Sequence, residues 1–349
     1  MASQIDITGL TLNAQEATDI GQLVIEQGLV RGELSEDHAI ETGVLYQMQI
    51  PFAGRIADSF KKAIGCVPGQ GTGFALTQKF WTPEIFATRF QHCAGDLNIL
   101  LKIFKKEARI NRDFYDKLDS EEMKLVIARI VDSMKEHLPT KVWFSEKLAA
   151  IQPAGNFKIG TDLSLYNVIN GLFQQIFSDA LIKRFVVTAN AGTTFALQAL
   201  PVDGGFDILT NVFNNADSRL LQDPTAKILV TRSISDSYRN TLRNKNLGGG
   251  FTDVTENGMS VLRFEGREVK TRYDWDDNIL ALENNGTRLR FPHRAVFTTK
   301  ENIPVGTLSE SDLKELTSHY DATLKQNIID VAFTLDAKML ESYMISVAY

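Results

Sequence analysis

The chain has 349 residues, enough for two or three domains, and its 44% apolar and 23% charged residues are typical of a globular protein. Its net charge of −6 argues against a dedicated nucleic-acid-binding protein, which usually needs a basic face. Two cysteines, Cys66 and Cys93, exclude a disulfide scaffold and a zinc site made of cysteines alone, and we expect two free thiols. Neither a signal peptide nor an apolar run long enough to span a membrane is visible, so we expect a soluble protein made in a cytoplasm.

The first third of the chain is predicted to be mainly helical. Ser35 can cap a helix over 36–50, and a second helix is predicted over 52–64. The segment 65–73, with four glycines and a proline, is predicted to be a loop. The best helical pattern of this region starts at Asp119, has capping-box spacing, and is expected to end at Pro139.

The second half alternates short strands and helices after a linker over 149–160. We predict, in chain order, a helix capped by Asp162 that carries Leu165 to Ile176, a strand over 184–188, a helix with an apolar stripe over 205–222, a strand over 226–231, a helix over 233–245, strands over 259–264 and 267–273, a hairpin at Asn285–Gly286, and strands over 295–299 and 328–335. The chain is therefore assigned to the α+β class, with a helical front and a β-rich rear half.

Signatures of catalysis are weak. The glycine-rich segment 69–73 lacks the preceding strand and the lysine of a phosphate-binding loop, and the five histidines are scattered. Three carboxylates surround Trp275; a Ca²⁺ or Mg²⁺ site is one interpretation, and a solvated loop anchored by Trp275 is the favoured one. We predict no catalytic, metal or cofactor site. The alternative is a cytoplasmic α/β enzyme whose site is formed by Asp274, Asp276, Asp277 and His293.

Short motifs of the rear half occur in an order that is typical of one fold. The 205–222 helix is followed by Asp223–Thr231, Ser235–Arg243, a glycine-rich loop, a hairpin over Leu262–Val269, and Arg294–Thr307. Over residues 205–349 this order resembles the major capsid proteins of tailed bacteriophages, which have the Hong Kong 97-like fold. The resemblance implies an N-terminal arm, an extended loop, a peripheral domain with a long spine helix, and an axial domain.

The resemblance also implies domain boundaries. These are an N-terminal arm with helices over 1–72, the extended loop and a helical insertion over 73–160, the peripheral domain with the spine helix over 161–225, the axial domain over 226–308, and return strands of the peripheral domain over 309–349.

The function implied is structural. Such a subunit self-assembles into hexamers and pentamers of an icosahedral shell around double-stranded DNA, in the virion, after assembly in the host bacterial cytoplasm. Portal, scaffolding and decoration proteins are further partners of this family; no cofactor and no membrane contact is implied. An encapsulin-type nanocompartment shell, which shares the fold, is the alternative within this class.

Contacts between subunits are expected at large aromatic side chains and at glycines in turns. Aromatic residues are favoured at the centres of interfaces, and packing within the same chain is the alternative for them. Removing residues 1–50 or replacing Trp81 with Ala is expected to prevent closed particles. The candidate interface residues are Phe74, Phe80, Trp81, Pro83, Gly204, Gly205 and Gly249.

Overall fold

The computed structural model describes residues 34–50, 79–92, 121–245, 252–254, 260–307, 317–321 and 326–349. Its helices are α2 (Leu34–Asp37), α5 (Glu121–Phe144), α6 (Leu172–Ser178), α7 (Gly204–Asn215), α8 (Ser218–Gln222), α9 (Arg232–Asn244) and α10 (Tyr273–Leu282), with short 3₁₀ helices at Leu163–Leu165, Thr188–Ala191, Lys300–Asn302 and Ser342–Met344. Its strands are β1 (Ile40–Glu41), β2 (Glu84–His92), β3 (Lys183–Phe185), β4 (Lys227–Val230), β5 (Thr252–Val254), β6 (Ser260–Phe264), β7 (Arg267–Thr271), β8 (Ala295–Thr298), β9 (Val305–Gly306), β10 (Thr317–Asp321), β11 (Gln326–Ala337) and β12 (Ile345–Ala348).

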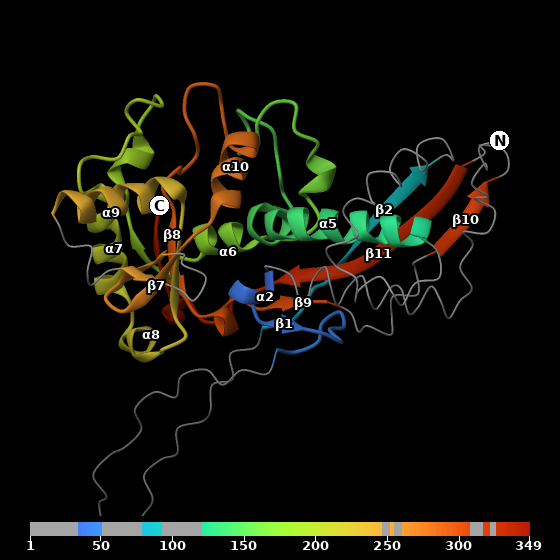
Figure 1. Ribbon diagram of the computed structural model, residues 1–349, viewed down its shortest axis with the longest axis horizontal. Coiled ribbons are helices and arrows are strands. Elements are labelled where there is room, and N and C mark those ends of the chain that lie inside the picture. The colour runs from blue at the N-terminus through green and yellow to red at the C-terminus, as the bar shows by residue number, and fades with distance from the viewer. Residues whose placement is uncertain are drawn as a thin grey trace, which may run out of the picture.

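A mixed sheet forms the centre of the body on the left of Figure 1. Among the described residues its seven strands follow the order β3-β12-β8-β4-β7-β6-β5. Strands β3 and β12 pair in parallel, as do β4 and β7, whereas β8 is antiparallel to both of its neighbours. The parallel pairs join segments that lie far apart in the sequence, because a parallel connection must cross over the sheet.

Both faces of this sheet are buried, which explains the continuous apolar runs of its central strands. Successive side chains of a strand point to opposite faces. Accordingly Phe297 of β8 packs with α7 and α9, and its neighbour Val296 belongs to the other core, which includes α5, α6 and α10. Figure 1 shows the two helical layers on either side of the sheet. The sequence predictions of β4, β8 and α9 are confirmed.

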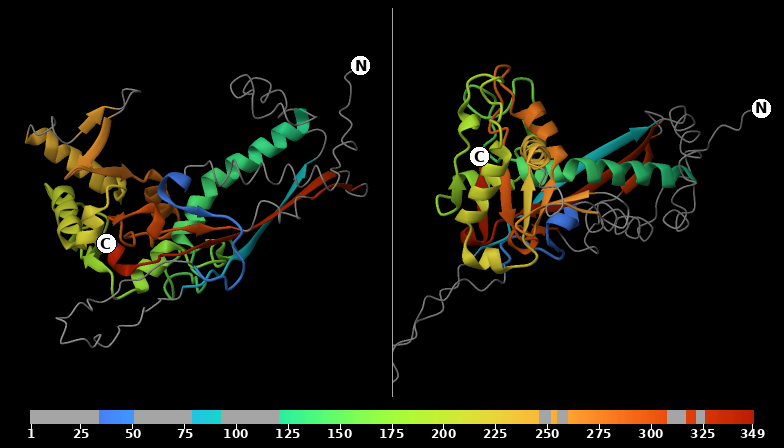
Figure 2. Two further views of the ribbon diagram at one scale, coloured as in Figure 1. Left: turned by 90° about the horizontal axis from the view of Figure 1, so that it is seen from below. Right: turned by 60° about the vertical axis from the view of Figure 1, so that its left-hand side comes forward.

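A second sheet carries the longest strands. Strand β11 has 12 residues and pairs with β10, β2 and β9, and β1 extends the sheet beyond β9. Helix α5 has 24 residues and packs Ile130 and Val131 into the same core as Val331 and Leu335 of β11. Helix α5 and the strands β2 and β11 project together from one side of the body (Figures 1 and 2).

The helix predicted over 36–50 is wrong. Helix α2 ends at Asp37, and the backbone that follows bonds to the segment 300–307 instead of to itself. The amide of Ala39 donates to the carbonyl of Lys300 at 3.1 Å, and the amide of Val44 donates to that of Thr307 at 3.0 Å. Strand β1 thus satisfies its polar groups by pairing with β9, which lies more than 250 positions later and leaves no local trace in the sequence.

Two helix boundaries also differ from prediction. Helix α5 continues past Pro139 to Phe144, because Val142 and Trp143, both 0% exposed, anchor its last turn in the core. The helix expected after Asp162 is interrupted. Asp162 caps only a 3₁₀ turn, and α6 begins after Gly171, whose amide donates to the Ser145 carbonyl at 2.7 Å.

The helix predicted over 205–222 is two helices. The chain turns to an extended conformation at Ala216, and the Asp217 side chain accepts a hydrogen bond from the Arg219 amide at 3.1 Å, which starts α8 as a new helix. The predicted turn between β6 and β7 is confirmed, with positive φ at both Glu265 (47°) and Gly266 (76°). The chain also reverses at Asn285–Gly286, as predicted, but the paired part is short: Asn284 and Leu289 form an antiparallel bridge, and the Arg290 amide donates to the Glu283 carbonyl at 3.0 Å.

Candidate assembly interface

A small platform joins two segments that are distant in the sequence. The Gln47 amide donates to the Trp81 carbonyl at 2.9 Å, and the Trp81 amide donates to the Met48 carbonyl at 2.9 Å. A third bond runs from the Ile50 amide to the Lys79 carbonyl, also at 2.9 Å. These bonds hold the segments 44–50 and 79–81 side by side, so that their side chains form an inner and an outer layer.

Trp81 belongs to the inner layer. It is 0% exposed and forms a small core with Val44, Ile50 and Leu340. It also covers Gly306 so closely that a Cβ at Gly306 would lie 2.9 Å from the indole ring. Trp81 thus packs within its own chain, which was the alternative to its expected role in a contact between subunits.

The outer layer is apolar and exposed. Leu45 is 59% exposed, Tyr46 66%, Met48 44% and Phe80 42%; we call these four residues the platform patch. Grouped exposed apolar side chains are typical of protein interaction sites. Phe80 thus stays a candidate contact, and Pro83, three residues later, is half-buried. Sequence reasoning missed Leu45 and Tyr46, because it assigned this segment to a helix.

An ion-pair network fixes the start of the described chain to the seven-stranded sheet. The Asp37 carboxylate is 0% exposed and accepts hydrogen bonds from Arg272 and, at 2.9 Å, from Lys270. Lys270 also pairs with Glu36 at 2.7 Å, and Arg272 with Asp274 at 2.7 Å. Burial by itself would raise the pKa of Asp37, but the Arg272 and Lys270 charges outweigh it and hold that pKa below 3.8.

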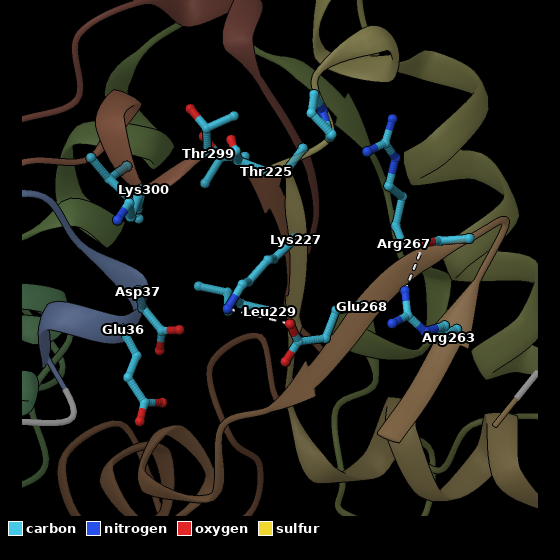
Figure 3. A pocket seen from close by; sticks show the side chains of 15 residues that line it. Glu36, Asp37, Thr225, Lys227, Leu229, Arg263, Arg267, Glu268, Thr299 and Lys300 are labelled. Carbon is cyan, nitrogen blue, oxygen red and sulfur yellow. Dashed lines mark hydrogen bonds and ion pairs between the residues drawn. The ribbon is translucent and has the colours of Figure 1, made fainter. Parts of the chain in front are cut away.

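The same region borders a cavity of about 420 Å³ between α2, β4, the β6–β7 turn and the 3₁₀ helix at Lys300. Figure 3 shows Lys227 reaching across it toward Glu268, at 3.3 Å. Glu36 and Asp37 on the opposite wall are paired with Lys270. Because its carboxylates are paired with basic groups, the cavity has the character of a mixed-charge cleft and not of a site with one dominant charge.

The four residues of the alternative enzyme site make contacts that hold the fold together, except for Asp277, which is exposed. Asp274 is bound to Arg272, and Asp277 is exposed. Asp276 accepts a hydrogen bond from the Arg232 amide at 2.7 Å, and burial raises its pKa to about 6. None of the four lines the cavity beside α2 or a second cavity, which lies beside Leu289 and Phe291. The carboxylates belong to helix α10, not to the expected loop, whereas the predicted anchor role of Trp275, 0% exposed, is confirmed.

Both ring nitrogens of His293 make hydrogen bonds within the fold. Its Nε2 lies 2.5 Å from the Gln198 carbonyl, an obligate acceptor, so Nε2 carries the proton and Nδ1 accepts from the Ser233 hydroxyl at 2.7 Å. Burial lowers the pKa of His293, which keeps the ring neutral. The imidazole therefore links the start of α9 to the segment around Gln198.

The predicted glycine contacts lie inside the chain. Gly204 and Gly205 are buried at the start of α7, and a Cβ at Gly205 would lie 2.5 Å from the Ile234 carbonyl oxygen and 2.8 Å from the Tyr238 amide. Gly205 thus allows α7 to approach α9, so its lack of a side chain has a role within the chain. Phe74, Gly249, Cys66 and Cys93 lie outside the described residues.

The described part of the chain contains neither a cluster of metal-binding side chains nor a membrane-spanning helix. No group of three or more His, Cys, Asp or Glu side chains there is placed to hold a metal ion. No helix among those residues is long and apolar enough to cross a membrane.

Comparison with known proteins identifies the fold. No protein-family model and no curated protein sequence matches the chain. Among solved structures, a chain of the satellite phage P4 procapsid with its size determination (Sid) protein is similar, with a TM-score of 0.57 and 13% identity, over 99% of this chain and 93% of that one. The capsid of the native GTA particle (TM-score 0.49, 9% identity, 90% and 88% covered) and the SrpI encapsulin complex from Synechococcus elongatus (0.45, 10%, 92% and 86%) also match. The chain has the Hong Kong 97-like capsid fold, as the sequence predicted.

Proposed function

We propose that this chain is the major capsid protein of a tailed bacteriophage, a structural subunit without catalytic activity. It self-assembles into hexamers and pentamers of an icosahedral shell that encloses double-stranded DNA. Portal, scaffolding and decoration proteins complete its set of partners. Its place is the virion capsid, after assembly in the cytoplasm of the bacterial host.

The observation that carries this proposal is the likeness to the P4 procapsid chain, which extends over 99% of this chain at a TM-score of 0.57. A likeness of that extent includes the projecting strands as well as the compact body. Elements that project from a body have few neighbours of their own chain. They reach their full burial when other copies pack against them.

The packing supports a domain assignment that differs from the expected one, in which the segment 161–225 contained the spine helix. We assign the spine helix to α5, since it has 24 residues and lies along β11, whereas α7 has 12 residues and packs on the seven-stranded sheet. That sheet with α7 and α9 forms the axial domain. The five-stranded sheet with α5 forms the peripheral domain, and β10 and β11 are its return strands.

The platform patch supports assembly through contacts between copies. Its four apolar side chains are exposed in the single chain although the backbone that carries them is fixed by the hydrogen bonds to the segment 79–81. A rigid apolar surface loses little conformational entropy when a partner covers it, so it is well suited to an interface.

The native mass of the purified protein tests the proposal. Light scattering together with negative-stain images of the same fraction should show megadalton hollow particles or rings of five and six subunits. A monomer or dimer at high concentration would overturn the capsid function. Nuclease-protected double-stranded DNA inside particles formed during infection separates a genome container from a nanocompartment, which would hold protein cargo.

A further inference from the structure

The segment between β3 and α7 has an unusual composition for a surface loop. From Phe185 to Val202 it contains no Asp, Glu, Lys or Arg, in a chain with 23% charged residues. Apart from one 3₁₀ turn, Thr188–Ala191, it has no regular structure after β3. Figure 1 shows it at the upper left of the body, on the same side as the segment that connects α10 to β8. Exposed irregular segments are usually polar, whereas interface centres are depleted of charge.

Two buried carboxamides hold this loop in a single arrangement. The Asn190 Nδ2 donates to the His293 carbonyl at 2.9 Å, and the His293 amide donates to Asn190 Oδ1 at 3.0 Å. Gln198 makes the same pair of bonds with Leu289: its Nε2 donates to the Leu289 carbonyl at 2.7 Å, and the Leu289 amide donates to Gln198 Oε1 at 2.9 Å. Asn190 is 6% exposed and Gln198 4%. Each side chain therefore replaces a missing backbone partner, and the loop is fixed to the segment 289–293.

The loop directs apolar side chains outward in spite of this rigid frame. Val186 is 56% exposed, Phe195 48%, Leu197 63% and Val202 86%; we call these four residues the loop patch. Together they expose on the order of 400 Å² of apolar surface, about half of what one partner buries in a standard interface. A groove of about 570 Å³ adjoins the loop at Asn190 and adds further contact area. Its lining combines apolar side chains, among them Leu289, Phe291 and the 74% exposed Ile159, with the charged Glu283, Arg288 and Arg290.

We propose that the loop patch and this groove form a contact between copies of this chain, with a second copy as the occupant. The inference rests on the proposed capsid function and names a surface that it uses. In a closed ring each copy presents two different surfaces, one to each neighbour. The loop patch and the platform patch are suited to this requirement because they lie on different parts of the chain: Figure 1 shows the segment 187–203 at the upper left and the segment 44–50 at the lower centre, near β1 and β9.

The lack of charge also argues for a permanent partner of this kind. A surface that is covered in every copy of the assembly has no need of charged residues for solubility, whereas a transiently covered surface usually retains them. The buried amide clamps fix the loop before binding, so little entropy is lost on contact.

The test uses Leu197→Asp and Val202→Asp in the full chain. Each substitution places a carboxylate in the proposed contact, where it would be buried without a partner. We expect the protein concentration at which half of the subunits are assembled to rise at least about tenfold, because the penalty recurs at every contact in a ring. Leu197→Met retains the apolar contact, and Asn214→Asp adds a carboxylate at an exposed position of α7; both controls should assemble as the wild type does.

Hydrogen exchange of the unmodified protein is the second measurement. The amides of 193–203 should exchange at least about tenfold more slowly in particles than in free subunits, since covering by a partner excludes water. Normal assembly of both aspartate variants, or unchanged exchange in this loop, would overturn the inference and leave the capsid function intact. Failure of the wild type to assemble would instead overturn the capsid function.

Discussion

Two adjacent residues, Phe80 and Trp81, allow the stability of the single chain and the contact between chains to be tested separately. Trp81 is 0% exposed and Phe80 42%. Truncating a fully buried tryptophan to alanine costs about 3–5 kcal/mol of unfolding free energy. The indole N–H of Trp81 is buried and has no hydrogen-bond partner among the described residues, so its removal recovers about 1–3 kcal/mol. For Trp81→Ala we therefore expect a net loss of about 2 kcal/mol, and for Phe80→Ala a loss of about 1 kcal/mol or less.

Urea unfolding of unassembled subunits, followed by tryptophan fluorescence and circular dichroism, measures both losses. Phe80→Ala should instead impair assembly at concentrations at which the wild type forms particles, because it removes apolar area from the platform patch. Trp81→Phe, which retains most of the buried ring, serves as the control and should recover most of the stability. If Trp81→Ala subunits are as stable as the wild type yet fail to assemble, the assignment of Trp81 to the chain's own core is refuted.

Three further substitutions probe the packing around these surfaces. Burial lowers the pKa of His38 from 6.5 to about 4, so below pH 6.5 the unfolded chain binds a proton that the folded chain does not. The free energy of unfolding should therefore fall by about 2 kcal/mol from pH 7 to pH 5. In urea titrations His38→Gln should lose this part of the pH dependence, and an equal pH dependence in wild type and variant would contradict it. Gly205→Ala should cost about 1–3 kcal/mol in thermal unfolding, because the added Cβ meets the Ile234 carbonyl at 2.5 Å; an unchanged melting temperature would count against this close approach. Asp37→Ala should lower the free energy of unfolding by about 3 kcal/mol, which is at the lower end for a broken buried ion pair because Arg272 still pairs with Asp274. The double variant Asp37→Ala/Arg272→Met should recover part of this loss in urea unfolding, and no recovery would argue against the pairing.

Local sequence signals were sufficient to predict a helix or strand wherever the residues that it pairs with are close in the sequence. The turn at Glu265–Gly266 needs two residues that tolerate positive φ, and β6 and β7 on either side of it were predicted on that basis. Helix α9 has a strong apolar stripe, with Ile234, Tyr238 and Leu242 all buried. Turn chemistry and helical periodicity are both properties of short windows, so a single sequence reveals them.

Long-range pairing explains the missed strand. Strand β2 bonds to β11, and its Arg89 pairs with Asp330, 241 positions later, at 2.6 Å. Its two phenylalanines, Phe86 and Phe90, are spaced by four, which is also a helical spacing. Nothing within the nine residues themselves selects a strand, because the apolar face is defined by α5 and β11.

Helix α10 had a signal that was misinterpreted. The three carboxylates near Trp275 suggested a solvated loop or a cation site, yet Asp274 and Asp276 stand in the first turn of a helix. Negative charges there are favourable because the helix N-terminus carries a partial positive charge. Acidic residues directly after a strand, followed by the apolar spacing of Trp275, Ile279 and Leu282, are therefore better interpreted as a helix start.

The interface residues could not be chosen by residue type. The sequence favoured aromatic residues and glycines, whereas Trp81 and Gly205 are used for internal packing and the exposed patches consist largely of aliphatic side chains. Phe80 forms an antiparallel bridge with Gln49, and in such an extended pair neighbouring side chains point to opposite sides. Phe80 faces out because Trp81 faces in. The orientation of each depends on a pairing between segments about 30 positions apart, and only that pairing distinguishes a core tryptophan from an exposed phenylalanine.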